Sequence, residues 1–295
     1  MNIALVTNKD LHHKYWIRQL YKKNKSKIKL IIIPKGKKKT IFEKISDKKI
    51  FYYGLFYLFL KLLSLFYNMF SFSVFSGSIR KAEKKYFINE SKKFKEIPEN
   101  LIRYVETVNC DESIKLIKKH KIHSIFFLGG DIAKNDFIKS ASVCLNYHSG
   151  LSPFYNGNKT IFHSVSDFRP NFAGGTLMKM NERIDGGEIL MHFLPEINNE
   201  DNAADLFMKG IIGSVKLFQH YIDNYDHEIK GIKQKKSFRY LRNIDWNITN
   251  DLRLLSFYKK DRMKIYSRDS EIISYINKGY DLSKMYSIVL TKILK

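Results

Sequence analysis

The sequence has few of the residues that cross-link or punctuate a chain. It holds two cysteines, five prolines and 15 glycines in 295 residues. Two cysteines exclude a disulfide-stapled scaffold and suit a reducing compartment, so we expect a cytoplasmic protein. So little proline and glycine excludes a collagen-like or Pro/Gly-rich disordered chain. The chain is long enough to bury a sizeable core without a metal or disulfide to stabilise it.

Acidic residues are also scarce, with 29 Asp and Glu against 52 Lys and Arg, a formal net charge of +23. Such a surplus attracts phosphates and anionic membranes. However, lysine outnumbers arginine 42 to 10, and arginine is the residue that suits bidentate contacts with phosphates and bases. We therefore favour a solvated basic surface. Attraction to a phosphorylated small substrate or a membrane is the alternative, and nucleic acid is less favoured.

Short apolar segments alternate with amphipathic ones over the first three quarters of the chain. This alternation predicts an α/β fold, with a mostly parallel sheet flanked by helices and a small C-terminal extension. The residues after the first strand, Asn8-Lys9-Asp10, lack the glycines of a dinucleotide-binding fingerprint. We expect strands at 2–7, 29–34, 101–108, 122–128, 142–147, 173–180 and 188–195, and helices at 11–21, 78–93, 111–119, 133–140 and 201–224.

The character of the chain changes after Tyr225, where residues 230–247 become basic and aromatic. About 70 residues follow that point, which is enough for a small subdomain or for packing back on the first. We therefore predict one main domain over residues 1–225 and a small C-terminal subdomain or extension over residues 226–295.

An aromatic run at residues 50–76 interrupts the first domain and carries one charge, Lys61. Its length suffices for a membrane span of about 20 residues, but a central lysine costs about 2.5–3.5 kcal/mol on insertion. A single span would also separate residues 2–34 from the later strands of the same sheet. We therefore expect an apolar helical insertion that is buried, joins two subunits of a homodimer, or lies on a membrane surface.

Polar groups follow two expected strands. Gly129-Gly130-Asp131 follow one, and Asn146 and His148 end the next. Two residues apart on a strand, Asn146 and His148 face the same side, where carboxamide and imidazolium N–H groups can stabilise an oxyanion. A carboxylate beside the ring, Asp185 in the turn Ile184–Gly187, would keep it protonated. Each residue alone fits an ordinary turn or cap, so the interpretation depends on their combination.

The ordered combination resembles the folate-dependent formyltransferases. The matching pattern is N-x-H, a proline five residues after the histidine, a glycine, and later G-x-T and I-D-G-G, and the resemblance covers residues 100–225 well. The residues that carry it are Asn146, His148, Pro153, Gly157, Gly174, Thr176, Ile184, Asp185, Gly186 and Gly187.

The resemblance implies formyl transfer from N10-formyltetrahydrofolate to a primary amine, with Asn146, His148 and Asp185 as catalytic residues. No metal is implied, and His12, His13, His163 and His192 lack metal-ligand spacing, so we expect structural roles for them. The resemblance also implies folate contacts at Leu128, Gly129, Gly130, Asp131, Met180, Arg183 and Ile184.

The acceptor amine is less constrained. Many family members have arginine where this chain has Asn156, and H-S-G-L-S-P replaces the commoner H-x-S-L-L-P. Glycinamide ribonucleotide is disfavoured because Asn8-Lys9-Asp10 cannot form the glycine-rich phosphate turn. The tail looks short for the C-terminal barrel of the tRNA enzymes. We favour an amino sugar on a nucleotide or lipid phosphate, with methionyl-tRNA formyl transfer as the alternative. An inactive homologue that binds nucleic acid or membrane is the non-enzyme alternative.

Overall fold

The computed structural model describes residues 1–35, 63, 66, 69, 75, 77–225, 229–235, 237–242, 245–259 and 262–294. The insertion expected at 50–76 therefore lies outside the described residues, except for four helical positions at 63, 66, 69 and 75. Within the described part of the chain, no helix combines the length and the apolar character that crossing a membrane requires.

Eight strands form one sheet in the order β10-β8-β7-β5-β4-β1-β2-β3. The pairings from β3 to β5 are parallel, whereas β7, β8 and β10 continue the sheet through antiparallel pairings. The strands are β1 (Ile3–Thr7), β2 (Ile28–Pro34), β3 (Ile102–Val105), β4 (Ser124–Leu128), β5 (Val143–His148), β7 (Gly175–Lys179), β8 (Ile189–Leu194) and β10 (Glu271–Ser274). A separate short pair joins β6 (Asn156–Gly157) to β9 (Tyr240–Leu241).

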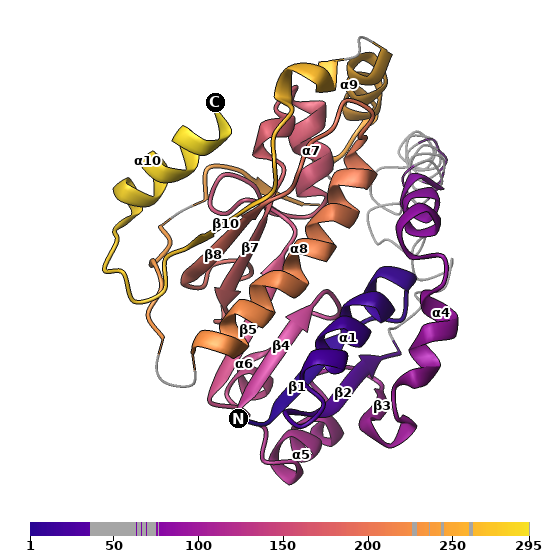
Figure 1. The fold of residues 1–295 in the computed structure, drawn as a ribbon, viewed down its shortest axis with the longest axis vertical. Coiled ribbons are helices and arrows are strands. Elements are labelled where there is room, and N and C mark those ends of the chain that lie inside the picture. Colours follow the sequence, from indigo (N-terminus) through magenta and orange to yellow (C-terminus); the bar gives the residue numbers. More distant parts are fainter. Residues whose placement is uncertain are drawn as a thin grey trace, which may run out of the picture.

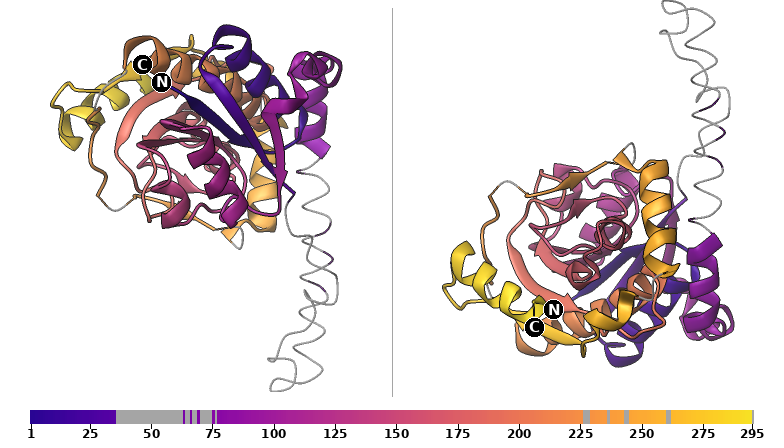
Figure 2. Two further views of the ribbon diagram at one scale, coloured as in Figure 1. Left: turned by 90° about the horizontal axis from the view of Figure 1, so that it is seen from below. Right: turned by 90° about the horizontal axis from the view of Figure 1, so that it is seen from above.

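Helices cover both faces of this sheet (Figures 1 and 2). On one face α1 (Leu11–Lys23) lies beside α8 (Ala203–Asn224), and Trp16 packs edge-on against Phe218 at 5.3 Å between ring centroids. The other face carries α5 (Asp111–Lys119) and α6 (Asn135–Ile138). The remaining helices are α4 (Glu90–Lys93), α7 (Thr160–Ser166), α9 (Ile248–Lys259) and α10 (Leu282–Ile293), and residues 77–87 are also helical.

The two-sided cover explains why the central strands are apolar throughout. In β1, Ile3 and Leu5 pack into the core beneath α1 and α8, while Ala4 and Val6 pack into the core beneath α5 and α6. A strand buried on both faces needs apolar residues at consecutive positions rather than at alternate ones. The predicted fold, a mostly parallel sheet flanked by helices, is confirmed.

The start of α8 differs slightly from the expected helix at 201–224. Asn202 is the N-cap, because its side chain accepts hydrogen bonds from the backbone N–H groups of Ala204 and Asp205. The Asp205 carboxylate in turn accepts from the Asn202 N–H, which completes a capping box. The helix therefore begins at Ala203, two residues later than expected.

The C-terminal segment joins the catalytic sheet through β10, which pairs with β8 at the sheet edge. Next to this strand the Arg268 guanidinium donates to the carbonyls of Pro195, Asn171 and Ala173 at 2.9, 2.6 and 2.6 Å. Burial lowers the pKa of Arg268 to about 10, so the side chain still carries its charge near neutral pH. The domain boundary near residue 225 stays a prediction.

We expect Arg268→Ala to destabilise the fold, because three carbonyls would lose their donor. Each unsatisfied buried group costs about 1–3 kcal/mol, so the free energy of unfolding should fall by about 3 kcal/mol or more. Thermal unfolding would then shift by at least about 6 °C at about 2–4 °C per kcal/mol. The control is Arg253→Ala on α9, where the side chain is exposed. Equal melting temperatures for the two variants would contradict this role of Arg268.

Candidate active site

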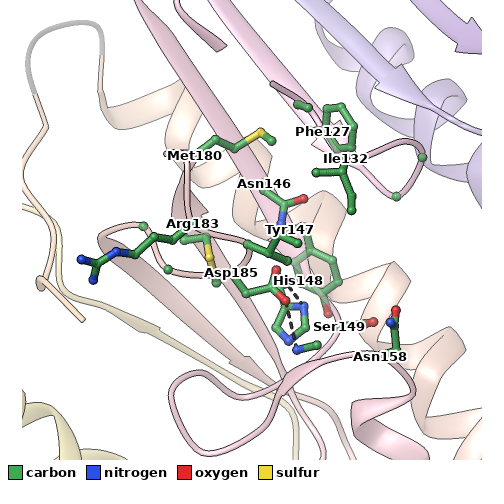
Figure 3. A pocket seen from close by; sticks show the side chains of 18 of the residues that line it. Phe127, Ile132, Asn146, Tyr147, His148, Ser149, Asn158, Met180, Arg183 and Asp185 are labelled. Atoms are coloured by element: carbon green, nitrogen blue, oxygen red, sulfur yellow. Dashed lines mark hydrogen bonds and ion pairs between the residues drawn. The ribbon is translucent and has the colours of Figure 1, made fainter. Parts of the chain in front are cut away.

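A cavity of about 390 Å³ opens beyond the carboxyl ends of β4 and β5 (Figure 3). Ligands of open α/β sheets bind at this kind of edge, where parallel strands end and the loops diverge. The cavity walls come from the loop after β4, the end of β5, the loop between β7 and β8, and the starts of α1 and α8.

Strand β5 carries Asn146 and His148 into the cavity together. Leu145 and Tyr147 point into the core beneath α1 and α8, so the alternation of the strand turns Asn146 and His148 to the other side. Both side chains line the cavity, as does Asp185 from the loop between β7 and β8. Figure 3 shows the three side chains pointing toward one another.

The His148 ring is held between two hydrogen-bond acceptors. Its Nδ1 lies 3.3 Å from Asp185 Oδ1, and its Nε2 lies 3.2 Å from the backbone carbonyl oxygen of Tyr155. Only a doubly protonated imidazolium can donate to both acceptors at once. The side chains of His148 and Asp185 are 6% and 9% exposed, so this pair is shielded from water.

Asp185 occupies a left-handed backbone conformation with φ of +52°. Its backbone carbonyl accepts hydrogen bonds from the side-chain amides of Asn156 and Gln234, both at 3.1 Å. Its carboxylate Oδ2 accepts from the Gly157 N–H at 3.0 Å. Asn156, which stands where many formyltransferases have arginine, is thus used to hold the loop that carries Asp185. Gln234, which lies in the C-terminal segment, holds the same loop.

Six of the seven residues expected to contact folate line the cavity. These are Gly129, Gly130, Asp131, Met180, Arg183 and Ile184. Leu128 does not line it, because its side chain is buried in the core beneath α1 and α8 and its carbonyl accepts from the Thr7 hydroxyl at 2.6 Å. Ile184, by contrast, is 48% exposed at the cavity rim.

Sequence reasoning missed several residues that shape the site. Gly150 is one, since a Cβ there would overlap both His148 Nε2 and the Tyr155 carbonyl. His12 and His13 are others: they line the cavity from the start of α1, directly beyond the end of β1. The rule that ligands bind where parallel strands end would have pointed to them, had it been applied to the first strand as well.

Within the described ranges, no group of three His, Cys, Asp or Glu side chains is arranged to hold a metal ion. His192, expected to be structural, bonds to the Tyr275 hydroxyl through Nδ1 and to the Ser152 carbonyl through Nε2, at 2.9 and 2.8 Å. Burial lowers its pKa to about 3. His192 is therefore a neutral bridge within the core.

Residues 107–211 match a family model described as "Formyl transferase". This segment runs from α5 into α8 and contains Asn146, His148 and Asp185. The segment 107–211 therefore belongs to the formyl transferase family.

Proteins similar in sequence to this chain include methionyl-tRNA formyltransferases. The Nitratiruptor protein is 36% identical over 80 residues, which are 27% of this chain and 26% of the relative. The Lactobacillus acidophilus protein is 28% identical over 136 residues, 45% of this chain and 43% of the relative. These matches span between a quarter and a half of the relatives' own length.

Solved structures with the same fold include a sugar N-formyltransferase from Shewanella, with a TM-score of 0.52 and 15% identity, covering 87% of this chain and 88% of that one. A 4-N formyltransferase from Francisella tularensis gives a TM-score of 0.52 at 16% identity, covering 87% of both chains. At this identity the likeness shows that the formyltransferase fold extends over most of the chain.

We expect Gly150→Ala to displace the His148 ring, because the added methyl group would overlap its Nε2 and the Tyr155 carbonyl. A crystal structure of the variant should show the contact between His148 Nδ1 and Asp185 Oδ1 broken or lengthened. The matched control is Gly77→Ala, at a helical position where a Cβ meets nothing within 4 Å. An unmoved His148 in Gly150→Ala would show that the site tolerates a side chain at this position.

Proposed function

We propose that the protein transfers a formyl group from N10-formyltetrahydrofolate to the primary amine of an amino sugar that is linked to a nucleotide or lipid phosphate. The observation that carries this proposal is the convergence of Asn146, His148 and Asp185 in one cavity at the end of β5. A carboxamide, an imidazole and a carboxylate together supply hydrogen-bond donors and a proton relay for acyl transfer without a covalent nucleophile.

The cavity residues fit the formyl donor. Gly129 and Gly130 have positive φ values of +66° and +122° and present bare backbone to the cavity. Exposed backbone N–H and C=O groups can pair with the edge of a pterin ring. The volume of about 390 Å³ lies within the range of about 300–1000 Å³ for small-ligand sites. Met180, Arg183 and Ile184 would cover the ring from the loop between β7 and β8. The donor supplies the formyl carbon and the nitrogen that leaves.

In the reaction the acceptor nitrogen attacks the formyl carbon, a C–N bond forms, and negative charge develops on the formyl oxygen. Asn146 Nδ2 donates a hydrogen bond to that oxygen, and the His148 imidazolium adds a positive charge beside it. Asp185 holds the ring in place and relays the proton from the attacking amine to the departing nitrogen. The proton thereby reaches tetrahydrofolate as the old C–N bond breaks.

The described C-terminal segment supports a small acceptor. Gln234 holds the loop of Asp185, and β10 pairs within the catalytic sheet, so this segment helps to build the formyltransferase domain itself. The Shewanella sugar N-formyltransferase, which shares the fold, supports this choice of acceptor. Methionyl-tRNA is the second candidate, because the sequence relatives named above act on it by name.

The test is an assay of tetrahydrofolate release with N10-formyltetrahydrofolate and a panel of amino sugar nucleotides, run beside charged initiator tRNA. We expect turnover with an amino sugar. Asn146→Ala should lower kcat by about 10²–10³-fold, the cost of one lost oxyanion donor, and Asp185→Asn should lower it by a similar factor, because a positioned proton-transfer group contributes about 10²–10⁴-fold.

The control is Asn89→Ala, at an exposed position outside the cavity, which should keep the wild-type rate. Near-normal transfer by either site variant would refute the assignment of Asn146 and Asp185. Turnover with initiator tRNA alone would replace the amino sugar with the second candidate.

A further inference from the structure

Two adjacent histidines at the start of α1 line the cavity but have no part in the chemistry above. His12 and His13 are 7% and 6% exposed, and their ring centroids lie 4.0 Å apart. Each ring uses its Nδ1 for a contact within the protein, which leaves Nε2 as the nitrogen available to a ligand. The two rings differ in what holds Nδ1, and this difference decides what each presents.

The contacts of His13 leave its Nε2 as a hydrogen-bond acceptor. The Thr7 hydroxyl has one proton, which it donates to the Leu128 carbonyl at 2.6 Å. At the 2.5 Å contact between Thr7 Oγ1 and His13 Nδ1, the histidine must therefore be the donor. Burial, followed by the charge of His12, lowers the pKa of His13 well below its usual value, so the ring is neutral. A neutral ring protonated at Nδ1 carries a lone pair on Nε2.

His12 faces a carboxylate instead. Glu83, in the helical stretch 77–87, lies 2.5 Å from His12 Nδ1 and is 8% exposed. Burial opposes the ionisation of Glu83, but the hydrogen bonds and charge from His12 outweigh it, and the pKa of Glu83 is lowered. Glu83 is thus an anion near neutral pH, and its carboxylate accepts the Nδ1 proton of His12. A buried carboxylate is compensated when its partner is an imidazolium, and an imidazolium has a second N–H, on Nε2.

We propose that His12 and His13 form a donor–acceptor pair that binds a hydroxyl group next to the acceptor amine. A hydroxyl accepts one hydrogen bond and donates another, so it pairs with His12 Nε2–H and with the lone pair of His13 Nε2. A methylene group in its place would leave both nitrogens unsatisfied. This inference rests on the proposed function, and it narrows the acceptor to amino sugars with a hydroxyl beside the amine.

The position of the pair suits the acceptor side of the cavity. The residues proposed to hold the formyl donor come from the loops after β4 and β7, whereas His12 and His13 begin α1, and Phe207 on α8 packs edge-on against His12. Gly129, which is proposed to contact the pterin ring, borders His13, because a Cβ there would lie 3.2 Å from His13 Cε1, so the histidine pair lies where the donor side of the cavity ends. His12, His13 and Phe207 thus form a part of the cavity wall to which the proposed donor-binding residues do not contribute.

The first test reads the ring protons directly. Long-range proton–nitrogen correlation spectra of nitrogen-labelled protein near neutral pH should show His13 neutral with its proton on Nδ1, and His12 protonated on both nitrogens. His12→Gln and His13→Gln assign the signals. In Thr7→Val the Nδ1–H group of His13 loses its acceptor, so the proton should no longer be fixed on Nδ1. Thr7→Ser retains the acceptor and should keep the proton on Nδ1. A proton on His13 Nε2, or a neutral His12, in the unaltered protein would overturn the proposal.

The second test compares acceptors that differ by one hydroxyl. The probes are UDP-glucosamine and UDP-4-amino-4,6-dideoxyglucose, each with its 3-deoxy analogue. We expect kcat/KM for the hydroxyl-bearing member of the accepted pair to be about 10–100-fold higher, since unsatisfied buried groups cost about 1–3 kcal/mol. Thr7→Val should bring that ratio close to one, and Thr7→Ser should preserve it. An unchanged ratio in Thr7→Val would overturn the role of His13.

Binding of a hydroxyl by the histidine pair can be tested even if the protein formylates none of the probes. If no probe accepts a formyl group, the proposed function fails, and the same spectra are recorded with each probe added. Selective movement of the His13 Nε2 signal by the hydroxyl-bearing probe would then support the histidine pair as a hydroxyl site. Identical spectra with the 3-deoxy analogue would overturn it.

Discussion

The buried contact between His148 and Asp185 joins two parts of the chain that approach the cavity from different directions. His148 ends β5, whose position is fixed by β4 on one side and β7 on the other. Asp185 sits on a loop in a left-handed conformation, which costs energy for a residue with a side chain. Removing one partner of a buried pair costs about 3–5 kcal/mol, because the other charge is left uncompensated. The loop must therefore be held firmly.

That requirement explains why residues distant in sequence surround the loop. Asn156, Gly157 and Gln234 all hydrogen-bond to Asp185. Gly157 also pairs with Leu241 in the β6–β9 ladder, so closely that a Cβ would overlap the Leu241 carbonyl. The basic, aromatic segment after residue 230 is thus connected to the site by backbone pairing and by one glutamine. The positive charge of this segment takes no part in these contacts.

Much of the fold was predictable because its strands are buried on both faces. Continuous apolar runs such as residues 30–34 have few other uses in a globular protein, and β2 contains this run. The short β10 was missed, because Glu271–Ser274 has neither a long apolar run nor strict alternation, and its pairing with β8 defines it. The helical insertion at 50–76 stays a prediction, since nearly all of it lies outside the described residues.

The three proposed catalytic residues could be predicted from the sequence, whereas several residues that support them could not. Asn146 and His148 follow from the two-residue period of a strand. Asp185 was proposed as the carboxylate beside the ring, and the resemblance to the formyltransferases implies the same role. The structure brings all three to one cavity. Gly150, Gln234 and the His12–His13 pair were missed as site residues, because their roles depend on close approach between segments that only the folded chain brings together. The spacing of residues along the sequence does not indicate such contacts.

The proposed formyl transfer is tested by following the formyl carbon itself. N10-formyltetrahydrofolate with an isotopically labelled formyl group is incubated with the protein and the amino sugar nucleotides, and the products are analysed by mass spectrometry. If the proposed transfer occurs, the label appears as a formamide on the sugar nitrogen, with one tetrahydrofolate released for each formamide formed. Label found only in free formate, or left on the folate, would contradict it.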